Sequence, residues 1–171
     1  EEIASRAEIS VGTLYNLFTS KETLYLTLIE QRVNGFLQHV TQHAETGRSA
    51  EDKLDRLLEG IFEYLEQHKA FFRLYVTTTH GLPWPLNSAM GEVLFAKYKD
   101  IQNYVIAICQ QGKEEKTFHT ESPLSLALAI LGVANVFLTK WVMGKKKRPL
   151  SASLADVQAH VHNLTYSAQK R

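Results

Sequence analysis

The sequence has few of the residues that interrupt helices, and it has only one cysteine. Its 171 residues include four prolines and nine glycines, and no stretch sustains the alternation of apolar and polar residues that marks a half-buried strand. We therefore predict an all-α protein. Because Cys109 has no second cysteine to pair with, an internal disulfide framework is excluded, and a cytoplasmic location is expected.

Catalytic motifs are absent as well. The sequence contains neither His-Glu-x-x-His nor Gly-x-Ser-x-Gly, and it has no glycine-rich loop that could hold phosphates. His39 and His43 have the four-residue spacing of a metal-binding pair on a helix, but no third ligand follows at a recognisable spacing. We expect no enzyme activity, no metal site and no cofactor.

Basic and acidic residues are also nearly equal in number, so neither sign of charge is in excess. The formal net charge of +1 gives no general indication of nucleic-acid binding. Residues 1–44 carry three cations against five carboxylates, a local balance of −2. If this segment binds DNA, backbone N–H groups at helix starts must contribute alongside the few cationic side chains.

The most informative pattern lies in residues 1–28, which are expected to form two short helices, a tight turn between them and the start of a long third helix. The two short helices would carry small apolar faces made of Ile3, Ala4 and Ala7 on the first and Leu14, Leu17 and Phe18 on the second. Ser10 stands where an N-cap oxygen would accept backbone N–H groups of the second helix. This layout is typical of a DNA-reading helix-turn-helix.

The same segment carries the pattern Ile3-Ala4-x-x-Ala7-x-Ile9-Ser10-x-x-Thr13-Leu14-Tyr15-x-x-Phe18-x-x-Lys21-Glu22-x-Leu24. This pattern resembles the N-terminal signature of the TetR family of transcriptional repressors. The family has one further helix ahead of Glu1, so the first helix of a three-helix head is expected to be absent here. The family also usually has glycine at the position of Glu8, where a side chain would cost about 1 kcal/mol if the backbone φ is positive.

The resemblance assigns the groove-facing role to the second helix and its flanks. The predicted DNA-binding residues are Ser10, Gly12, Thr13, Tyr15, Asn16 and Lys21. An asparagine can offer a paired donor and acceptor to adenine, whereas hydroxyl groups and lysine suit phosphates. The partners that the resemblance implies are a palindromic double-stranded operator and a second copy of the chain.

Helical spacing continues to the end of the chain. A long helix should begin after Thr19-Ser20 and run to about Ala44, with Leu24, Leu28, Val33, Phe36, Leu37 and Val40 facing inward. Further helices are expected at 50–65, 69–79, 88–111, 123–143 and 154–168. We divide the chain into a DNA-binding head with its linker helix, residues 1–44, and an effector-binding and dimerisation domain, residues 45–171.

Residues 124–143 are nearly all apolar and are followed by the basic run Lys145-Lys146-Lys147-Arg148, which imitates a membrane helix with its cytoplasmic flank. Asn135 and Lys140 lie within the span and favour a core helix shared with a partner subunit. We therefore expect no membrane and a homodimer, whose predicted interface consists of Leu128, Leu131, Leu138, Leu154, Val157, Val161 and Leu164.

Aromatic residues come from several of the predicted helices, around the place where the TetR family keeps its effector cavity. The predicted effector-binding residues are Phe36, Phe62, Phe72, Tyr75, Trp84, Tyr98, Phe137 and Trp141. Their rings are apolar and their polar tips are few, which favours a small apolar or aromatic effector.

These features together predict an effector-responsive transcriptional repressor that a lipophilic or aromatic molecule releases from a palindromic operator. The effector would bind one arrangement of the two heads better than the other and so shift the population away from the DNA-competent state. Two alternatives stay open at this point: a helical small-molecule-binding protein that does not read DNA, and a membrane-anchored helical protein.

Overall fold

The computed structural model describes residues 1–79, 89–144 and 148–166, and within these ranges the regular structure is helical, as the sequence predicts. The helices are α1 (Glu2–Arg6), α2 (Val11–Leu17), α3 (Lys21–Ala44), α4 (Ala50–Gln67), α5 (Lys69–Thr79), α6 (Ala89–Glu114), α7 (Pro123–Met143), the 3-10 helix η1 (Leu150–Ser153) and α8 (Leu154–Tyr166).

Serine N-caps fix where four of the helices begin. The side chains of Ser10, Ser20, Ser49 and Ser122 each accept the backbone N–H three residues later, at 2.9 to 3.2 Å. Each cap satisfies one N–H group that a helix start leaves without an intrahelical partner. Pro123 then occupies the first position of α7, where its missing N–H is not needed.

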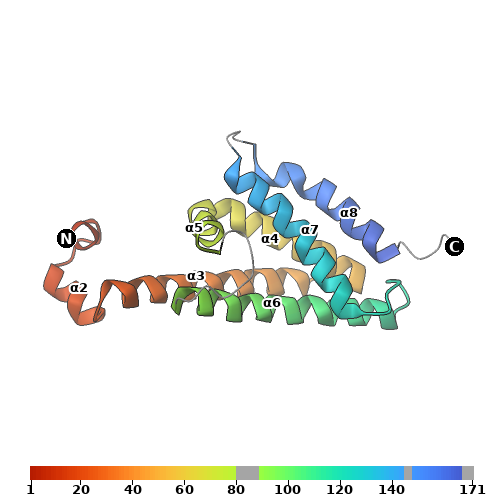
Figure 1. The fold of residues 1–171 in the computed structure, drawn as a ribbon, viewed down its shortest axis with the longest axis horizontal. Helices are drawn as coiled ribbons and strands as arrows, with labels where there is room; N and C mark the ends of the chain where they lie inside the picture. The colour runs from red at the N-terminus through yellow and green to blue at the C-terminus, as the bar shows by residue number, and fades with distance from the viewer. Residues whose placement is uncertain (80–88, 145–147, 167–171) are drawn as a thin grey trace.

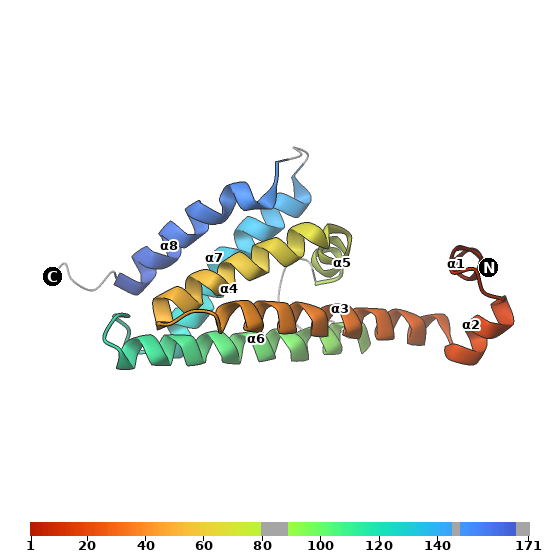
Figure 2. The ribbon, with the colours of Figure 1, turned by 180° about the vertical axis from the view of Figure 1, so that it is seen from behind.

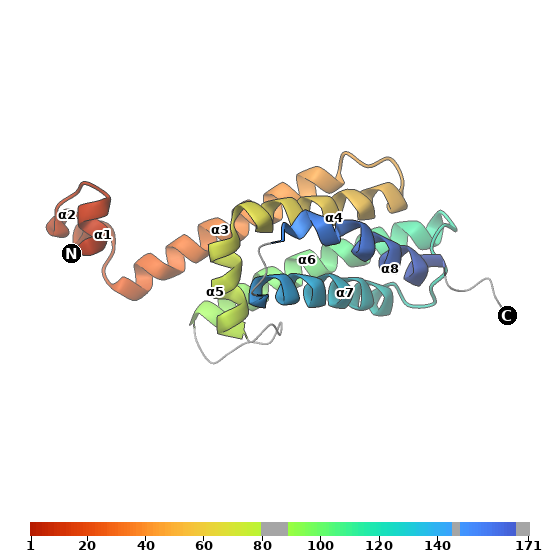
Figure 3. The same ribbon diagram turned by 90° about the horizontal axis from the view of Figure 1, so that it is seen from above.

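The molecule is elongated because α3 and α6 lie side by side along its length (Figures 1 and 2). Helices α1 and α2 form a head at the far end of α3, away from the rest of the chain. Seen from above, α4, α7 and α8 lie across the opposite half of these two long helices, with α5 turned across the middle (Figure 3). We call this helical part from the second half of α3 onward the body.

The core of the body is built mainly by α4, whose apolar stripe is buried. Leu54, Leu57, Leu58 and Phe62 are at most 1% exposed and pack in one cluster with side chains of α6, α7 and α8. Burying a leucine or phenylalanine side chain contributes about 1.5–3 kcal/mol each, so this helix is a main source of the stability of the body.

Helix α7 is long and apolar enough to cross a membrane, but in this structure it packs as a core helix. Its inner face is buried against the rest of the body through Leu126, Ala127, Ile130, Leu131, Ala134, Leu138 and Val142. Length and composition alone do not separate a core helix from a membrane span, and here the inner face already has protein neighbours.

The structure corrects four of the predicted dimer-interface residues. Val157 and Val161 are completely buried within one chain, between α8 and its neighbours, so they cannot contact the surface of a partner directly. Leu131 and Leu138 lie on the inner face of α7 and are 8% and 6% exposed. An apolar stripe shows that a helix is covered, but it does not show which neighbour covers it.

Three further corrections concern apolar residues near the N-terminus. Leu17 and Ile3 are 65% and 46% exposed, because two short helices have too little surface to cover one another, and among the residues of α1 and α2 only Ala4 is buried. In α3, Leu28 is 49% exposed and Ile29 is buried in its place. The inward face of α3 is rotated by one residue there relative to the prediction.

Candidate functional site

Helix α2 presents polar side chains to solvent along its whole length. Thr13, Tyr15 and Asn16 are exposed, and Tyr15 has 64% of its surface accessible. A side chain at Gly12 would meet nothing closer than the Ser10 hydroxyl at 3.7 Å, so packing within the chain does not require glycine there. The predicted DNA-binding residues of α2 are therefore available to a surface that approaches from outside.

Ser10, which is predicted to bind DNA, also caps the N-terminus of α2. Its Oγ accepts the Thr13 backbone N–H at 2.9 Å and lies 2.8 Å from the Thr13 hydroxyl, so the two side chains close the first turn of α2. Lys21 is exposed at the first position of α3, next to the N-cap Ser20. A phosphate at this helix start would meet the lysine and the positive end of the α3 dipole, next to the Glu22 carboxylate, whose pKa a backbone hydrogen bond at the same helix start lowers.

The turn between α1 and α2 contains a strained residue. Glu8 has a φ of 55°, in the left-handed region that favours glycine. The resemblance to the TetR family placed a glycine at this position, and the structure keeps the conformation that such a glycine would adopt. The side chain of Glu8 therefore costs about 1 kcal/mol of local stability.

The body contains an apolar cavity of about 120 Å³ between α3, α4, α5, α6 and α7. This volume is roughly ten times the volume that one buried water needs. A small ligand group therefore fits into the cavity without opening the core. The lining consists of Val33, Phe36, Ile61, Leu65, Phe71, Phe72, Leu94, Lys97, Tyr98, Ile101, Leu131, Ala134, Asn135 and Leu138.

Lys97, Tyr98 and Asn135 bring the polar groups of this lining. Lys97 Nζ forms an ion pair with Asp100 at 3.5 Å and is partly exposed. Burial raises the pKa of the Tyr98 phenol above its usual value, so this group is neutral at physiological pH. The cavity can therefore hold a mostly apolar ligand and offer it one cation near the solvent-exposed side.

The cavity includes three of the eight predicted effector-binding residues: Phe36, Phe72 and Tyr98. Phe62 is 1% exposed within the core instead, because it lies on the most deeply buried part of α4. The side chain of Tyr75 and the whole of Trp84 lie outside the described residues.

Phe137 and Trp141 do not line the cavity. The Phe137 ring lies 5.9 Å from the His160 ring of α8, and Trp141 Nε1 donates to the Arg148 carbonyl at 2.9 Å. Lys69 Nζ lies 4.4 Å above the Trp141 ring, a cation–π contact. These two aromatic residues hold the end of α7 to its neighbours.

Sequence reasoning missed most of the aliphatic lining. Leu131 and Leu138 were assigned to the dimer interface, yet they face the cavity from α7 with Ala134 between them. Their spacing of three and four residues, 131-134-135-138, is that of one helix face. That periodicity was visible, but it is the same for a cavity wall and for a subunit interface.

Helix α3 connects the two candidate sites. It begins beside α2 at Lys21, and Val33 and Phe36 in its middle line the cavity. A ligand that changes how α3 packs at Phe36 therefore acts on the same rigid element that carries the head. Elsewhere in the core, burial raises the pKa of the Cys109 thiol to about 12 and keeps it protonated, so this thiol is not poised as a nucleophile.

Two family models together match the described body and head. Residues 1–28 match the model of bacterial regulatory proteins of the tetR family, and residues 29–166 match the C-terminal region of YsiA-like proteins. The boundary between the two matches falls inside α3, which is the element that joins the head to the cavity.

Curated relatives agree with these matches. The chain is 32% identical over 74 residues to the HTH-type transcriptional activator FasR of Mycolicibacterium smegmatis, a match that covers 43% of this chain and 34% of FasR. It is 22% identical over 152 residues to the fatty acid metabolism regulator protein of Bacillus subtilis, covering 88% of this chain and 76% of that protein. The chain thus aligns with about a third of the length of FasR.

Solved structures share the fold. The transcriptional regulator FadR from Bacillus subtilis in complex with stearoyl-CoA superposes with a TM-score of 0.77 at 20% identity, covering 95% of this chain and 86% of that one. The fatty acid degradation regulator FadR from Bacillus halodurans gives 0.76 at 23% identity, covering 94% and 84%. The chain therefore belongs to the TetR family of bacterial regulatory proteins, a family of DNA-binding transcription regulators.

Proposed function

We propose that this chain is a cytoplasmic, homodimeric repressor that leaves a palindromic operator when a long-chain acyl group, carried by an acyl-CoA, enters the cavity and widens it by pushing its helices apart. The main support for this function is the apolar cavity, because α3 both lines the cavity and carries the head. The proposal narrows the lipophilic or aromatic effector expected from the sequence to an acyl chain.

The cavity lining supports an acyl chain rather than a polar ligand. Aliphatic and aromatic side chains from five helices surround it, and Lys97 is the charged residue among them. Such a site gains free energy by removing hydrocarbon from water, whereas a sugar or a free nucleotide would lose hydrogen bonds there. Two of the relatives are named for fatty acid regulation, and one was solved with stearoyl-CoA, which supports the same ligand class.

Lys97 gives the acyl chain an orientation. Its ammonium group can meet the thioester carbonyl or a phosphate of the carrier while the chain lies against Phe36, Leu94 and Leu138. The Lys97 side chain is about one third exposed, so a charge-assisted contact with a phosphate of the carrier can form at the solvent-facing side of the cavity. The carrier would therefore remain near the surface of the body.

The outer face of α7 supports the homodimer. Leu124, Leu128 and Val136 are 48%, 45% and 66% exposed and follow one another at multiples of four residues. Gly132 completes the series, and a side chain there would meet nothing within 4 Å. Such a ridge with a gap at its centre can interlock with its own copy across a two-fold axis.

Release of DNA follows from α3 as the shared element. In a dimer, a palindromic operator fixes the separation of the two heads, because each α2 must enter a major groove about one helical turn or a simple multiple apart. A ligand that pushes on α3 at Val33 and Phe36 favours another separation and thereby lowers the affinity for the operator.

The experiment fills the cavity from within. Ala134→Phe places a ring between Leu131 and Leu138, where Ala134 now leaves space, and should abolish the rise in melting temperature that stearoyl-CoA gives the unmodified protein. Ala107→Phe, the same change at an exposed alanine of α6, is the matched control and should keep the full rise. An equal rise in both variants, or a rise with hexoses but not with acyl-CoA, would overturn the proposal.

A further inference from the structure

The contact between α3 and α4 brings together two histidines and two glutamates. His39 and His43 lie one turn apart on α3, and their rings stack with centroids 5.7 Å apart at 26°. Glu59 and Glu63 lie one turn apart on the facing side of α4. His39 Nε2 is 3.8 Å from a Glu63 carboxylate oxygen, and His43 Nε2 is 3.8 Å from a Glu59 carboxylate oxygen.

A glycine explains why the two helices come close enough for these contacts. A Cβ atom at Gly60 would lie 3.0 Å from His43 Cβ and 3.5 Å from Val40 Cα, so any side chain there would push α4 away from α3. Gly60 stands between Glu59 and Glu63 in the chain. The absence of its side chain lets both carboxylates reach the histidine rings.

One nitrogen of the group lacks the hydrogen bond that a buried polar atom normally makes. His39 Nε2 is shielded from solvent and has no hydrogen-bond partner among the described residues. Most buried polar atoms in folded proteins are paired, so each exception asks for an explanation. Coordination of a metal ion by Nε2 would satisfy it.

The geometry of three of these residues suits such an ion. His39, His43 and Glu63 each offer one ligand atom, and these atoms lie within 4.8 Å of one another. Ligands of a tetrahedral zinc ion, each 2.0–2.1 Å from the metal, lie about 3.3 Å apart. The Glu63 side chain is 50% exposed, and its other carboxylate oxygen accepts a hydrogen bond from Gln67 Nε2 at 3.2 Å. Metal binding would therefore need a small turn of this carboxylate away from Gln67 and of the two imidazole rings toward one another.

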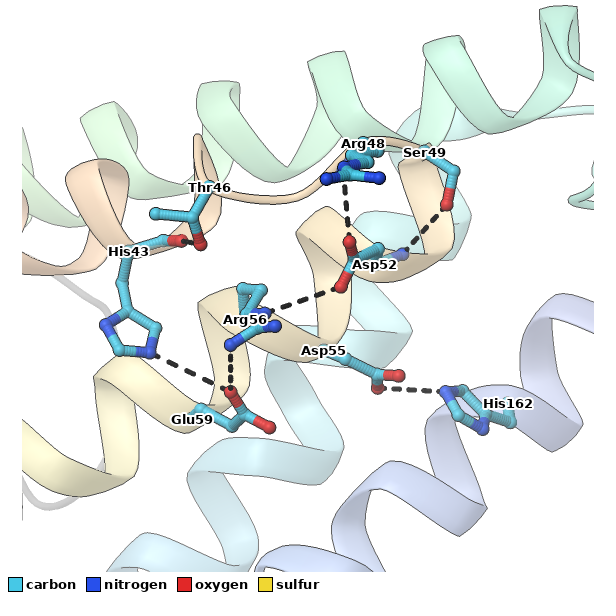
Figure 4. Close-up of polar contacts among 9 residues, drawn as sticks. All are labelled: His43, Thr46, Arg48, Ser49, Asp52, Asp55, Arg56, Glu59 and His162. Atoms are coloured by element: carbon cyan, nitrogen blue, oxygen red, sulfur yellow. Dashed lines mark hydrogen bonds and ion pairs between the residues drawn. The ribbon is translucent and has the colours of Figure 1, made fainter.

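We propose that His39, His43 and Glu63 bind a divalent transition-metal ion of the zinc type, with Glu59 as the fourth ligand. Two imidazoles with carboxylates are a donor set typical of zinc, whereas magnesium and calcium prefer oxygen ligands throughout. Glu59 also lies 3.8 Å from Arg56, as Figure 4 shows together with its contact to His43, so metal binding would draw Glu59 away from this arginine.

The ion would join α3 to α4 at a place separate from the cavity. Because α3 carries the head, metal binding fixes the helix whose position the effector is proposed to change. The site stands on its own contacts, so it does not depend on which effector the cavity takes.

The test uses the untagged full chain after removal of metal with a chelator. Titration with zinc chloride in a calorimeter should show one saturable equivalent per chain, and excess magnesium should not compete. Glu63→Gln changes little in shape and should weaken zinc binding by at least about tenfold, and His39→Ala should do the same. His119→Ala removes an exposed histidine elsewhere on the body and is the matched control, which should bind zinc as tightly as the unmodified protein.

Circular dichroism of each variant checks the fold, and Glu63→Gln decides the question if His39→Ala unfolds. The proposal is overturned if no saturable zinc binding occurs, if Glu63→Gln binds as tightly as the unmodified protein, or if His119→Ala loses as much affinity as His39→Ala. In each of these cases the four side chains are ion pairs between two helices and nothing more.

Discussion

Individual side chains of the head divide into those that can read a base and those that can only hold a phosphate. Asn16 is exposed on α2 with a donor and an acceptor on the same amide, the pair that adenine offers in the major groove. Lys21 has a single mobile charge at the start of α3. Substitution of Asn16 should therefore change base preference, whereas substitution of Lys21 should change the overall affinity for DNA.

Asn16→Ala should relax the preference at one operator position by about 1–3 kcal/mol, because one base-edge contact is lost. Lys21→Ala should weaken binding to all sequences alike and reduce the salt dependence by about one phosphate. Binding of each variant to a library of single-base operator changes, measured at two salt concentrations, separates the two effects. A uniform loss from Asn16→Ala would show that another residue reads the base.

Lys116, in the turn after α6, has a left-handed backbone conformation. Its φ is 61°, and it turns the chain so that the Thr117 and Phe118 N–H groups both donate to the Gly112 carbonyl at the end of α6. The Phe118 ring then lies so close to Gly112 that a Cβ atom at this position would clash with it. Glycine would be preferred at 116, and lysine is tolerated at an energetic cost.

Lys116→Gly should therefore raise the free energy of unfolding by about 1 kcal/mol, since glycine adopts this φ without strain. Lys116→Ala keeps the Cβ atom and should give no such gain. Urea denaturation of the two variants in parallel measures the difference. Equal stabilities of the glycine and alanine variants would show that the conformation at this position carries no strain.

At the scale of elements, a carboxylate from one helix holds the start of another. Glu66 of α4 accepts the backbone N–H groups of Leu150 and Ser151 at 3.1 and 3.2 Å, which ties η1 and the start of α8 to the core. The N–H groups at a helix start have no intrahelical partner, and a negative charge there is favourable. Glu66 thereby positions α8 against α4.

Glu66→Ala should lower the free energy of unfolding by about 1–3 kcal/mol, because two N–H groups lose a charged acceptor. Glu66→Gln keeps one acceptor oxygen and should lose less. Chemical denaturation gives the stabilities, and hydrogen exchange at residues 150 and 151 should speed up in the alanine variant. Unchanged exchange at these two amides would contradict the role assigned to Glu66.

Helix boundaries were predictable because their signals are local. Ser10, Ser20 and Ser49 mark helix starts by their own side chains, and Pro123 marks the start of α7 by its missing N–H. The confirmed family match rests on the same kind of local pattern in residues 1–28. These signals need no knowledge of what lies next to each helix.

Contacts between helices were not predictable, because periodicity identifies the apolar face of a helix but not the element that packs against it. Val161 was expected between subunits and is buried within one chain, and Leu138 was expected there and lines the cavity. The pair His39 and His43 was visible by its spacing, but Glu63 comes from another helix and has no sequence signal that links it to them. Tertiary packing supplies that information.

At the scale of the whole molecule, the dimer proposed above depends on the outer face of α7. The variant to test is Leu128→Glu with Val136→Glu, since both residues are exposed in the single chain and neither supports its core. Charges at these positions would be buried without partners in the dimer, which is strongly unfavourable. The expected result is a folded monomer with much weaker operator binding.

Sedimentation together with circular dichroism distinguishes this result from unfolding. Val161→Glu is a useful contrast, because it places a charge in the core of a single chain and should unfold the body instead. A Leu128→Glu, Val136→Glu double variant that still sediments as a dimer would place the subunit interface elsewhere.

We infer that the cavity and the head share one equilibrium through α3, and this coupling can be measured by reciprocal binding experiments. The operator affinity is determined by fluorescence anisotropy with and without saturating stearoyl-CoA, and the stearoyl-CoA affinity by calorimetry with and without saturating operator. Linkage requires the two ratios to be equal, and we predict that each binding partner weakens the other by the same factor, at least about fivefold. If stearoyl-CoA binds the free and the operator-bound protein with the same affinity, the cavity does not control DNA binding and the account is contradicted.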